Sequence, residues 1–230
     1  MFVILMNIIK CIFASSIGKK YVMAVTGSML FGFVCIHLLG NLQIFLGPDH
    51  INAYAAMLQG NKLVLWSFRA VMLGLVMTHI TMAASLTIEN LAARPVAYAD
   101  GKVPYASFAS RTMVYGGIAL FAFILFHILH FTVGVVTPDI MHHIDAKGRH
   151  DVYQMMIEGF SYKWVSLAYI VAMVALYLHL SHGVESFFQT LGLKNRAYGG
   201  AITTLSKLAA AVILFGNCAI VMAVMTGIIH

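Results

Sequence analysis

The chain is poor in charged residues. Asp, Glu, Lys and Arg make up 10% of its 230 residues, whereas a soluble globular domain carries about 25%. Hydrophobic residues make up 61%, and the mean hydropathy is +0.88. This composition excludes a soluble domain and predicts an integral membrane protein. The net charge of +6 is modest, so we attribute it to membrane topology and expect no nucleic-acid partner.

Cysteine motifs are also absent. The three cysteines, Cys11, Cys35 and Cys218, form neither a CxxC pair nor the CxxCH site to which haem is attached covalently. Disulfides, a zinc site and covalently bound haem therefore have no support. The sequence also lacks internal repeats and any long alternating pattern of the kind that builds a membrane β-barrel.

Five apolar segments are long enough to cross a bilayer as helices, which takes about 20 residues. They cover residues 21–46, 63–88, 112–136, 164–190 and 203–229. We therefore predict an all-α integral membrane protein, with a five-transmembrane-helix bundle over residues 21–230. Residues 1–20 form a cytoplasmic or interfacial N-terminal segment. Its apolar stretch from Met1 to Ala14 is too short to span and lacks the order of a signal peptide.

The distribution of Lys and Arg predicts the orientation. Nine of them fall on one side of the apolar segments and four on the other, with Arg69 inside the second segment. The nine are Lys10, Lys19, Lys20, Arg94, Lys102, Arg111, Lys194, Arg196 and Lys207, and the four are Lys62, Lys147, Arg149 and Lys163. The richer side is normally cytoplasmic. We therefore predict a cytoplasmic N-terminus and an external C-terminal His230.

Two external connections contain polar residues. Residues 48–60 are similar to a short interfacial helix, and residues 138–160 form the longest predicted loop. This loop contains His142, His143 and His150, which could bind a metal. Their spacing matches no specific ligand pattern, so we favour a solvated polar loop.

A histidine lies deep inside each of the first four apolar segments. An ionisable side chain within a membrane span is costly and marks a functional site by default. His37 follows Lys20, and His127 follows Arg111, by nearly the same number of positions. At the rise of an α-helix, both histidines are about 25 Å from the cytoplasmic surface, at one level nearer the outside.

The other two deep histidines lie on segments that run in the opposite direction. His79 follows Lys62, and His179 follows Lys163, again by nearly equal numbers of positions. These two histidines therefore share a level nearer the cytoplasm. The two levels are separated by about 10 Å along the membrane normal.

Two histidines at one depth suit a haem b, whose iron takes one imidazole nitrogen above and one below the ring. We predict two such haems, one held by His37 and His127 and the other by His79 and His179, stacked as a path for electrons. Each ligand would be a neutral imidazole, and its other nitrogen would donate to a backbone carbonyl one turn earlier.

Other interpretations of these residues stay open. Each histidine could be a satisfied polar residue at a helix interface. His130 and His182 follow ligand candidates by three residues and share their helix faces, although their depths fit less well. The nearby glycines Gly32, Gly40, Gly74 and Gly183 could admit a flat porphyrin or allow close helix packing.

Basic side chains could pair with haem propionates. Arg69 lies near the outer level, whereas Lys19, Lys20 and Arg111 lie at the cytoplasmic edge. The alternative for these side chains, and the better one for the lysines, is snorkelling to the membrane interface.

Four stretches together resemble one family over nearly the whole chain. They are SSIGKKYVMAVTG (15–27), HLLGNLQIFLGPDHINAYAAML (37–58), FHILHFTVG (126–134) and MVALYLHLSHGVESFFQTLGL (173–193). They are similar to the cytochrome b membrane anchor of succinate:quinone oxidoreductases, the succinate dehydrogenases and fumarate reductases, in the class with one five-helix, two-haem anchor. The resemblance implies ligation by His79 with His179 for the proximal haem and by His37 with His127 for the distal haem.

The resemblance also implies partners and a location. It implies a flavoprotein with covalent FAD and an iron–sulfur subunit, both on the cytoplasmic face of a bacterial cytoplasmic membrane, and a quinone, expected to be menaquinone. Some fumarate reductases of this class carry a glutamate for proton passage two residues before the ligand on the fourth helix. Tyr177 occupies that position here, so a glutamate path of that kind has no support.

The chain lacks a flavin motif and a dicarboxylate site, so we expect an electron-transfer subunit rather than a complete catalyst. Asp49, His50, Asp139 and His142 are weak candidates for protonating quinone at the outer surface. Two alternatives remain: a cytochrome b of a hydrogenase or formate dehydrogenase, and a transporter that uses histidines without haem.

Overall fold

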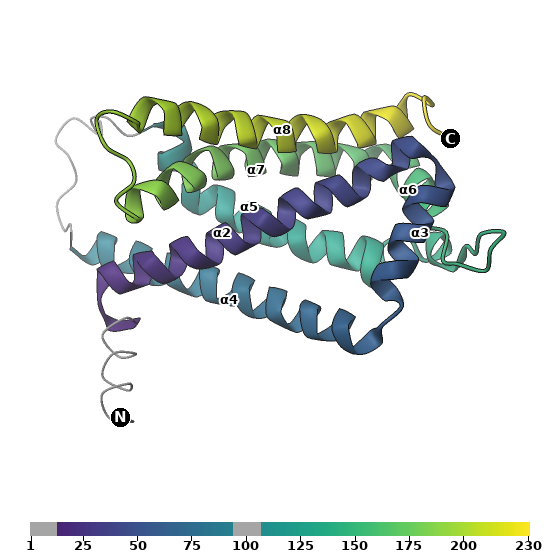
Figure 1. The fold of residues 1–230 in the computed structure, drawn as a ribbon, viewed down its shortest axis with the longest axis horizontal. Coiled ribbons are helices and arrows are strands. Elements are labelled where there is room, and N and C mark those ends of the chain that lie inside the picture. The colour runs from purple at the N-terminus through teal and green to yellow at the C-terminus, as the bar shows by residue number, and fades with distance from the viewer. Residues whose placement is uncertain (1–12, 94–106) are drawn as a thin grey trace.

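The computed structural model describes residues 13–93 and 107–230 (Figure 1). The described residues form helices and no strand, apart from one isolated bridge between Ile144 and His150. The helices are α2 (Ser16–Asn41), η1 (Leu42–Leu46), α3 (Pro48–Gln59), α4 (Lys62–Ala92), α5 (Phe108–Ile128), η2 (Leu129–Val133), η3 (Pro138–His142), α6 (Val152–Ser161), α7 (Lys163–Thr190) and α8 (Gly199–Met225). Lys10, Arg94, Lys102 and most of the stretch from Met1 to Ala14 lie outside the described residues.

Among the described residues, five helices are long and apolar enough to cross a membrane: α2 with η1, α4, α5 with η2, α7, and α8. The prediction of an all-α bundle with five such helices is therefore confirmed, and it is compatible with a multi-pass membrane protein. The first long helix begins at Ser16, inside the predicted N-terminal segment. The hydroxyl of Ser15 accepts a hydrogen bond from the Gly18 amide at 3.0 Å, which caps this helix.

Helix α7 lies at the centre of the packing. It contacts α8, α5, α2 and α6, while α2 also packs against α4 and α8. In Figure 1, α2 crosses diagonally in front of α5 and leads from the end that carries Lys19 to the end that carries α3. We call these the Lys19 end and the α3 end. Large apolar side chains are exposed along the outer faces of all five long helices, as a lipid environment requires.

The α3 end is closed by two short helices. The prediction of a short helix over residues 48–60 is confirmed by α3. The prediction of a loop over residues 138–160 is wrong in part, because it contains η3 and most of α6. Asp151 caps α6 by accepting a hydrogen bond from the Gln154 amide, and α6 buries Met155, Met156 and Phe160 in the end of the bundle.

Candidate functional site

The four deep histidines form two facing pairs. The ring centroids of His37 on α2 and His127 on α5 are 5.7 Å apart, and those of His79 on α4 and His179 on α7 are 6.4 Å apart. These are the same two pairs that we predicted from the depth of each histidine in its apolar segment. Within the described chain, neither α2 with α5 nor α4 with α7 is among the helix pairs that pack extensively. Each pair of imidazoles therefore joins two helices that have few direct contacts with each other.

The distance between the two ring centroids of each pair is close to that of two imidazoles bound to one haem iron. An imidazole nitrogen lies about 2 Å from a transition metal that it ligates, so two imidazoles on one iron have ring centres about 6 Å apart. The two observed separations, 5.7 and 6.4 Å, lie on either side of this value. The centroid separations of both pairs therefore agree with two imidazoles on one iron, and the ring planes of the two pairs are inclined at 86° and 62°.

The two pairs lie at different levels along α2. The His79 ring is next to Gly27, because a Cβ atom on that glycine would lie 3.1 Å from His79 Cε1. His37 lies ten residues further along the same helix, which is about 15 Å. Since α2 runs obliquely in Figure 1, the separation across the bundle is smaller than this distance along the helix.

His79 has a hydrogen-bond partner on a neighbouring helix. Its Nδ1 lies 3.1 Å from the hydroxyl of Thr26 on α2, and that hydroxyl lies 2.8 Å from the Val22 carbonyl. When the hydroxyl proton goes to the carbonyl, which is the shorter contact, His79 Nδ1–H donates to the hydroxyl oxygen and the lone pair remains on Nε2. The partner is a side chain of another helix and not the predicted carbonyl one turn earlier. A hydrogen bond of this kind is the support that metal-ligating histidines usually have on their second ring nitrogen.

His127 and His130 share one partner. The Nδ1 atoms of His127 and His130 lie 3.0 and 3.1 Å from the hydroxyl of Tyr169 on α7. His130 is fully buried, and its ring centroid is 4.0 Å from that of Phe131. Within the described part of the chain, its Nε2 has no hydrogen-bond partner. It lies in η2, a short π-helical stretch that ends α5. Of the two histidines, His127 is the one whose ring faces His37.

His37 and His179 differ in what surrounds their nitrogens. The Asn41 side-chain amide donates to His37 Nε2 at 3.2 Å, so ligation through Nε2 would displace that bond. His179 Nδ1 is buried and has no partner among residues 13–93 and 107–230. A cavity of about 200 Å³ lies against His179 between α5 and α7, and Thr112 and Gly116 are among the residues that line it. A buried imidazole nitrogen without a protein partner is costly, and a bound group would remove this cost.

The predicted glycines separate into two kinds. A Cβ atom on Gly32, Gly74 or Gly183 would meet no described residue within 4 Å, so these positions face open space. A Cβ on Gly40 would lie 2.7 Å from the Tyr54 ring, so Gly40 serves the packing of α3 against α2. Gly74 is exposed, whereas Gly32 and Gly183 are half-buried, so the open space at these positions agrees with a lipid-facing surface as well as with a flat ligand.

The predicted propionate partners lie in three different settings. Lys19 is buried and forms an ion pair with Glu89 of α4 at the Lys19 end. Arg69 is exposed on α4, and its guanidinium carbon lies 4.9 Å from the centroid of the Trp66 ring. Arg111 is exposed near the start of α5. The structure therefore does not bring these three residues together.

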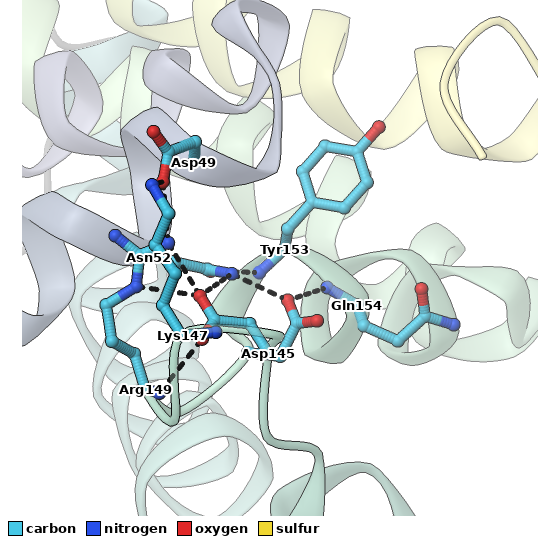
Figure 2. Close-up of polar contacts among 8 residues, drawn as sticks. Asp49, Asn52, Asp145, Lys147, Arg149, Tyr153 and Gln154 are labelled. Carbon is cyan, nitrogen blue, oxygen red and sulfur yellow. Dashed lines mark hydrogen bonds and ion pairs between the residues drawn. The ribbon is translucent and has the colours of Figure 1, made fainter.

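Sequence reasoning missed a polar network at the α3 end (Figure 2). The amide nitrogen of the fully buried Asn52 donates to Asp151 at 2.9 Å and to Asp145 at 3.4 Å, and its oxygen accepts from the Tyr153 amide at 3.0 Å. These bonds tie α3 to the start of α6. The signal in the sequence was weak, because the partners are separated by about 100 positions.

Ion pairs extend this network to the surface. Arg149 contacts both Asp145 and Asp49, and Lys147 also contacts Asp49 (Figure 2). Hydrogen bonding from the Arg149 side chain lowers the pKa of Asp145 to about 2, and hydrogen bonding from Lys147 and Arg149 lowers the pKa of Asp49. Asp49 is thus held as a paired carboxylate, while the other weak candidates, His50, Asp139 and His142, are exposed.

The loop histidines bind separate partners. His143 Nε2 lies 2.8 Å from Glu158, and His150 Nε2 lies 3.2 Å from the Met141 carbonyl. Hydrogen bonds from Gln154 and His143 lower the pKa of Glu158. Over residues 13–93 and 107–230, no group of three or more His, Cys, Asp or Glu side chains could hold a metal ion.

No family model, curated protein or solved structure matches the chain.

Proposed function

We propose that the chain is the cytochrome b membrane anchor of a succinate:quinone oxidoreductase. It holds two bis-histidine haems b and carries electrons between an iron–sulfur subunit and a membrane quinone, expected to be menaquinone. The observation that supports this proposal best is the presence of two facing histidine pairs, with ring centres 5.7 and 6.4 Å apart, on four separate helices. The haem groups supply reversible one-electron transfer when bound.

The protein's own residues have distinct roles in this proposal. His79 and His179 hold the haem nearer the Lys19 end, and Thr26 orients His79. His37 and His127 hold the haem nearer the α3 end. The apolar faces of the helices exclude water from both pairs and keep the imidazoles neutral, as metal ligands must be.

The orientation and the partners are part of the proposal. The Lys19 end faces the cytoplasm of a bacterial cell, in agreement with the excess of Lys and Arg on that side of the sequence. The iron–sulfur subunit and the flavoprotein dock there, which brings the proximal haem closer to them than the distal haem. The sequence resemblance supports this assignment of partners.

Purification of the complex from native membranes tests the proposal. We expect a dithionite-reduced spectrum with two b haems for each copy of this chain, and copurification of a subunit with covalent FAD and an iron–sulfur subunit. The same haems with hydrogenase or formate dehydrogenase subunits would contradict the assignment to this complex. An intact complex without haem would contradict the whole proposal.

A further inference from the structure

Tyr169 lies between His127 and His130, which are both candidates for the iron ligand opposite His37. Its hydroxyl is 3.0 Å from His127 Nδ1 and 3.1 Å from His130 Nδ1. The three rings are close neighbours, since the centroids of both imidazoles lie 5.8 Å from that of Tyr169. Tyr169 is itself buried, so water does not readily replace either hydrogen bond.

The hydroxyl has a single proton. When that proton is donated to His127 or His130, Tyr169 donates to one imidazole and accepts a hydrogen bond from the other. The two histidines then hold opposite tautomers. The imidazole that donates its Nδ1–H to Tyr169 keeps the lone pair on Nε2, whereas the imidazole that accepts carries its proton on Nε2.

We propose that Tyr169 is a positioning residue that makes His127, and not His130, the iron ligand opposite His37. In this arrangement His127 Nδ1–H donates to the Tyr169 oxygen, which leaves Nε2 as the ligating nitrogen. Tyr169 donates its proton to His130 Nδ1, which places a proton on His130 Nε2 and prevents that atom from ligating. This inference rests on the proposed function.

The packing around each histidine agrees with this division. The ring of His127 faces His37 at 5.7 Å. The ring of His130 is packed against Phe126 and Phe131, and a Cβ on Gly159 would lie 3.2 Å from His130 Cε1. His130 is therefore held by aromatic rings and by α6, with no space for a porphyrin on that side.

Replacement of Tyr169 by Phe tests the inference, because Phe keeps the ring and removes the hydroxyl. A hydrogen bond to a ligating imidazole makes it a stronger electron donor, so its loss should raise the midpoint potential of one haem and leave the other unchanged. That haem should also be lost faster to a haem scavenger, by on the order of 10-fold. The matched control is Tyr177→Phe, on the same helix, which should change neither property.

A second pair of variants tests which histidine ligates. We expect His127→Ala to lose the haem affected by Tyr169→Phe, and His130→Phe to retain it. Two haems in the wild type with unchanged potentials and retention in Tyr169→Phe would overturn this inference and leave the proposed function standing. Loss of both haems in Tyr169→Phe would also overturn it, because a positioning residue for one ligand leaves the other pair intact. Absence of haem from the wild-type complex would instead overturn the proposed function.

Discussion

At the scale of single residues, two of the four deep histidines, His79 and His127, are bonded to hydroxyl groups of neighbouring helices. Thr26 serves His79, and Tyr169 serves His127 and His130. Each of these hydroxyls joins two helices, so it contributes to stability as well as to the orientation of a ring. A buried polar atom that loses its partner lowers the free energy of unfolding by about 1–3 kcal/mol.

The Thr26 hydroxyl is the hydrogen-bond partner of His79 Nδ1. Thr26→Val keeps the shape of the side chain but leaves His79 Nδ1 without a partner, so we expect a loss of about 1–3 kcal/mol in the free energy of unfolding. Thermal unfolding in detergent measures this loss. Thr81→Val is the control, because the Thr81 hydroxyl bonds only to the Met77 carbonyl of its own helix and is exposed. Equal effects of the two changes would contradict the role given to Thr26.

Low pH should destabilise the protein through the carboxylate of Asp145. The pKa of Asp145 is lowered from its ordinary value of 3.8 to about 2, chiefly by the Arg149 side chain. Because the folded-state pKa is the lower one, the stabilisation is fully present above about pH 4 and is lost as the pH falls towards 2. We expect Asp145→Asn to make the stability of the protein less dependent on pH in this window, as followed by thermal unfolding between pH 6 and pH 2.

Asp139→Asn is the control for this experiment. Asp139 is an exposed aspartate in the same connection and is not among the hydrogen-bond or ion-pair partners of Asn52, Arg149 and Lys147 within the described residues. Its replacement should leave the pH dependence as it is in the wild type. An unchanged pH dependence in Asp145→Asn would show that the network does not respond to acid through this carboxylate.

At the scale of helices, close contacts depend on a few glycines. A Cβ on Gly216 of α8 would lie 2.9 Å from a methyl group of Leu38 on α2. We expect Gly216→Val to lower the free energy of unfolding by about 1–3 kcal/mol, because the added methyls overpack this contact. Gly200→Val, on the same helix with nothing within 4 Å of its Cβ, should be close to neutral when both are compared by thermal unfolding. A neutral Gly216→Val would show that α2 and α8 can separate freely.

The helices differ in how well the sequence predicts them. The five long ones follow from apolar runs alone, since length and hydropathy decide whether a segment can cross a bilayer. Helix α6 was not predicted because residues 138–160 are rich in charge and histidine. Its apolar face of Met155, Met156 and Phe160 is buried against the end of the bundle, and that packing cannot be predicted from the segment alone. The histidine pairs could be predicted because the number of residues between a flanking Lys or Arg and a histidine, along a straight helix, converts directly to a depth in the membrane.

The partners of those histidines could not be predicted in the same way. Thr26 and His79 are 53 positions apart, and His127 and Tyr169 are 42 positions apart. Which side chains meet depends on the rotation of each helix about its axis, and apolar runs do not specify that rotation when lipid surrounds the bundle. The same limit applies to Lys19, whose ion pair with Glu89 links two helices.

At the scale of the whole molecule, the two ends of the bundle should face different compartments. Ala146 is exposed at the α3 end, and Ala197 is exposed at the end that carries Lys19. In a chain whose native cysteines are replaced, we expect Ala146→Cys to react with a membrane-impermeant maleimide added to intact cells. Ala197→Cys should react only after the membrane is opened. The reverse pattern would contradict the proposed cytoplasmic N-terminus.

The central claim is that each facing pair of histidines holds one haem. Four single replacements by Ala, at His37, His79, His127 and His179, test it through haem stoichiometry and redox titration of the purified complex. We expect each variant to retain one haem, with His37 and His127 losing the same haem and His79 and His179 losing the other. A wild type without haem, or losses that group the histidines in any other way, would contradict the account.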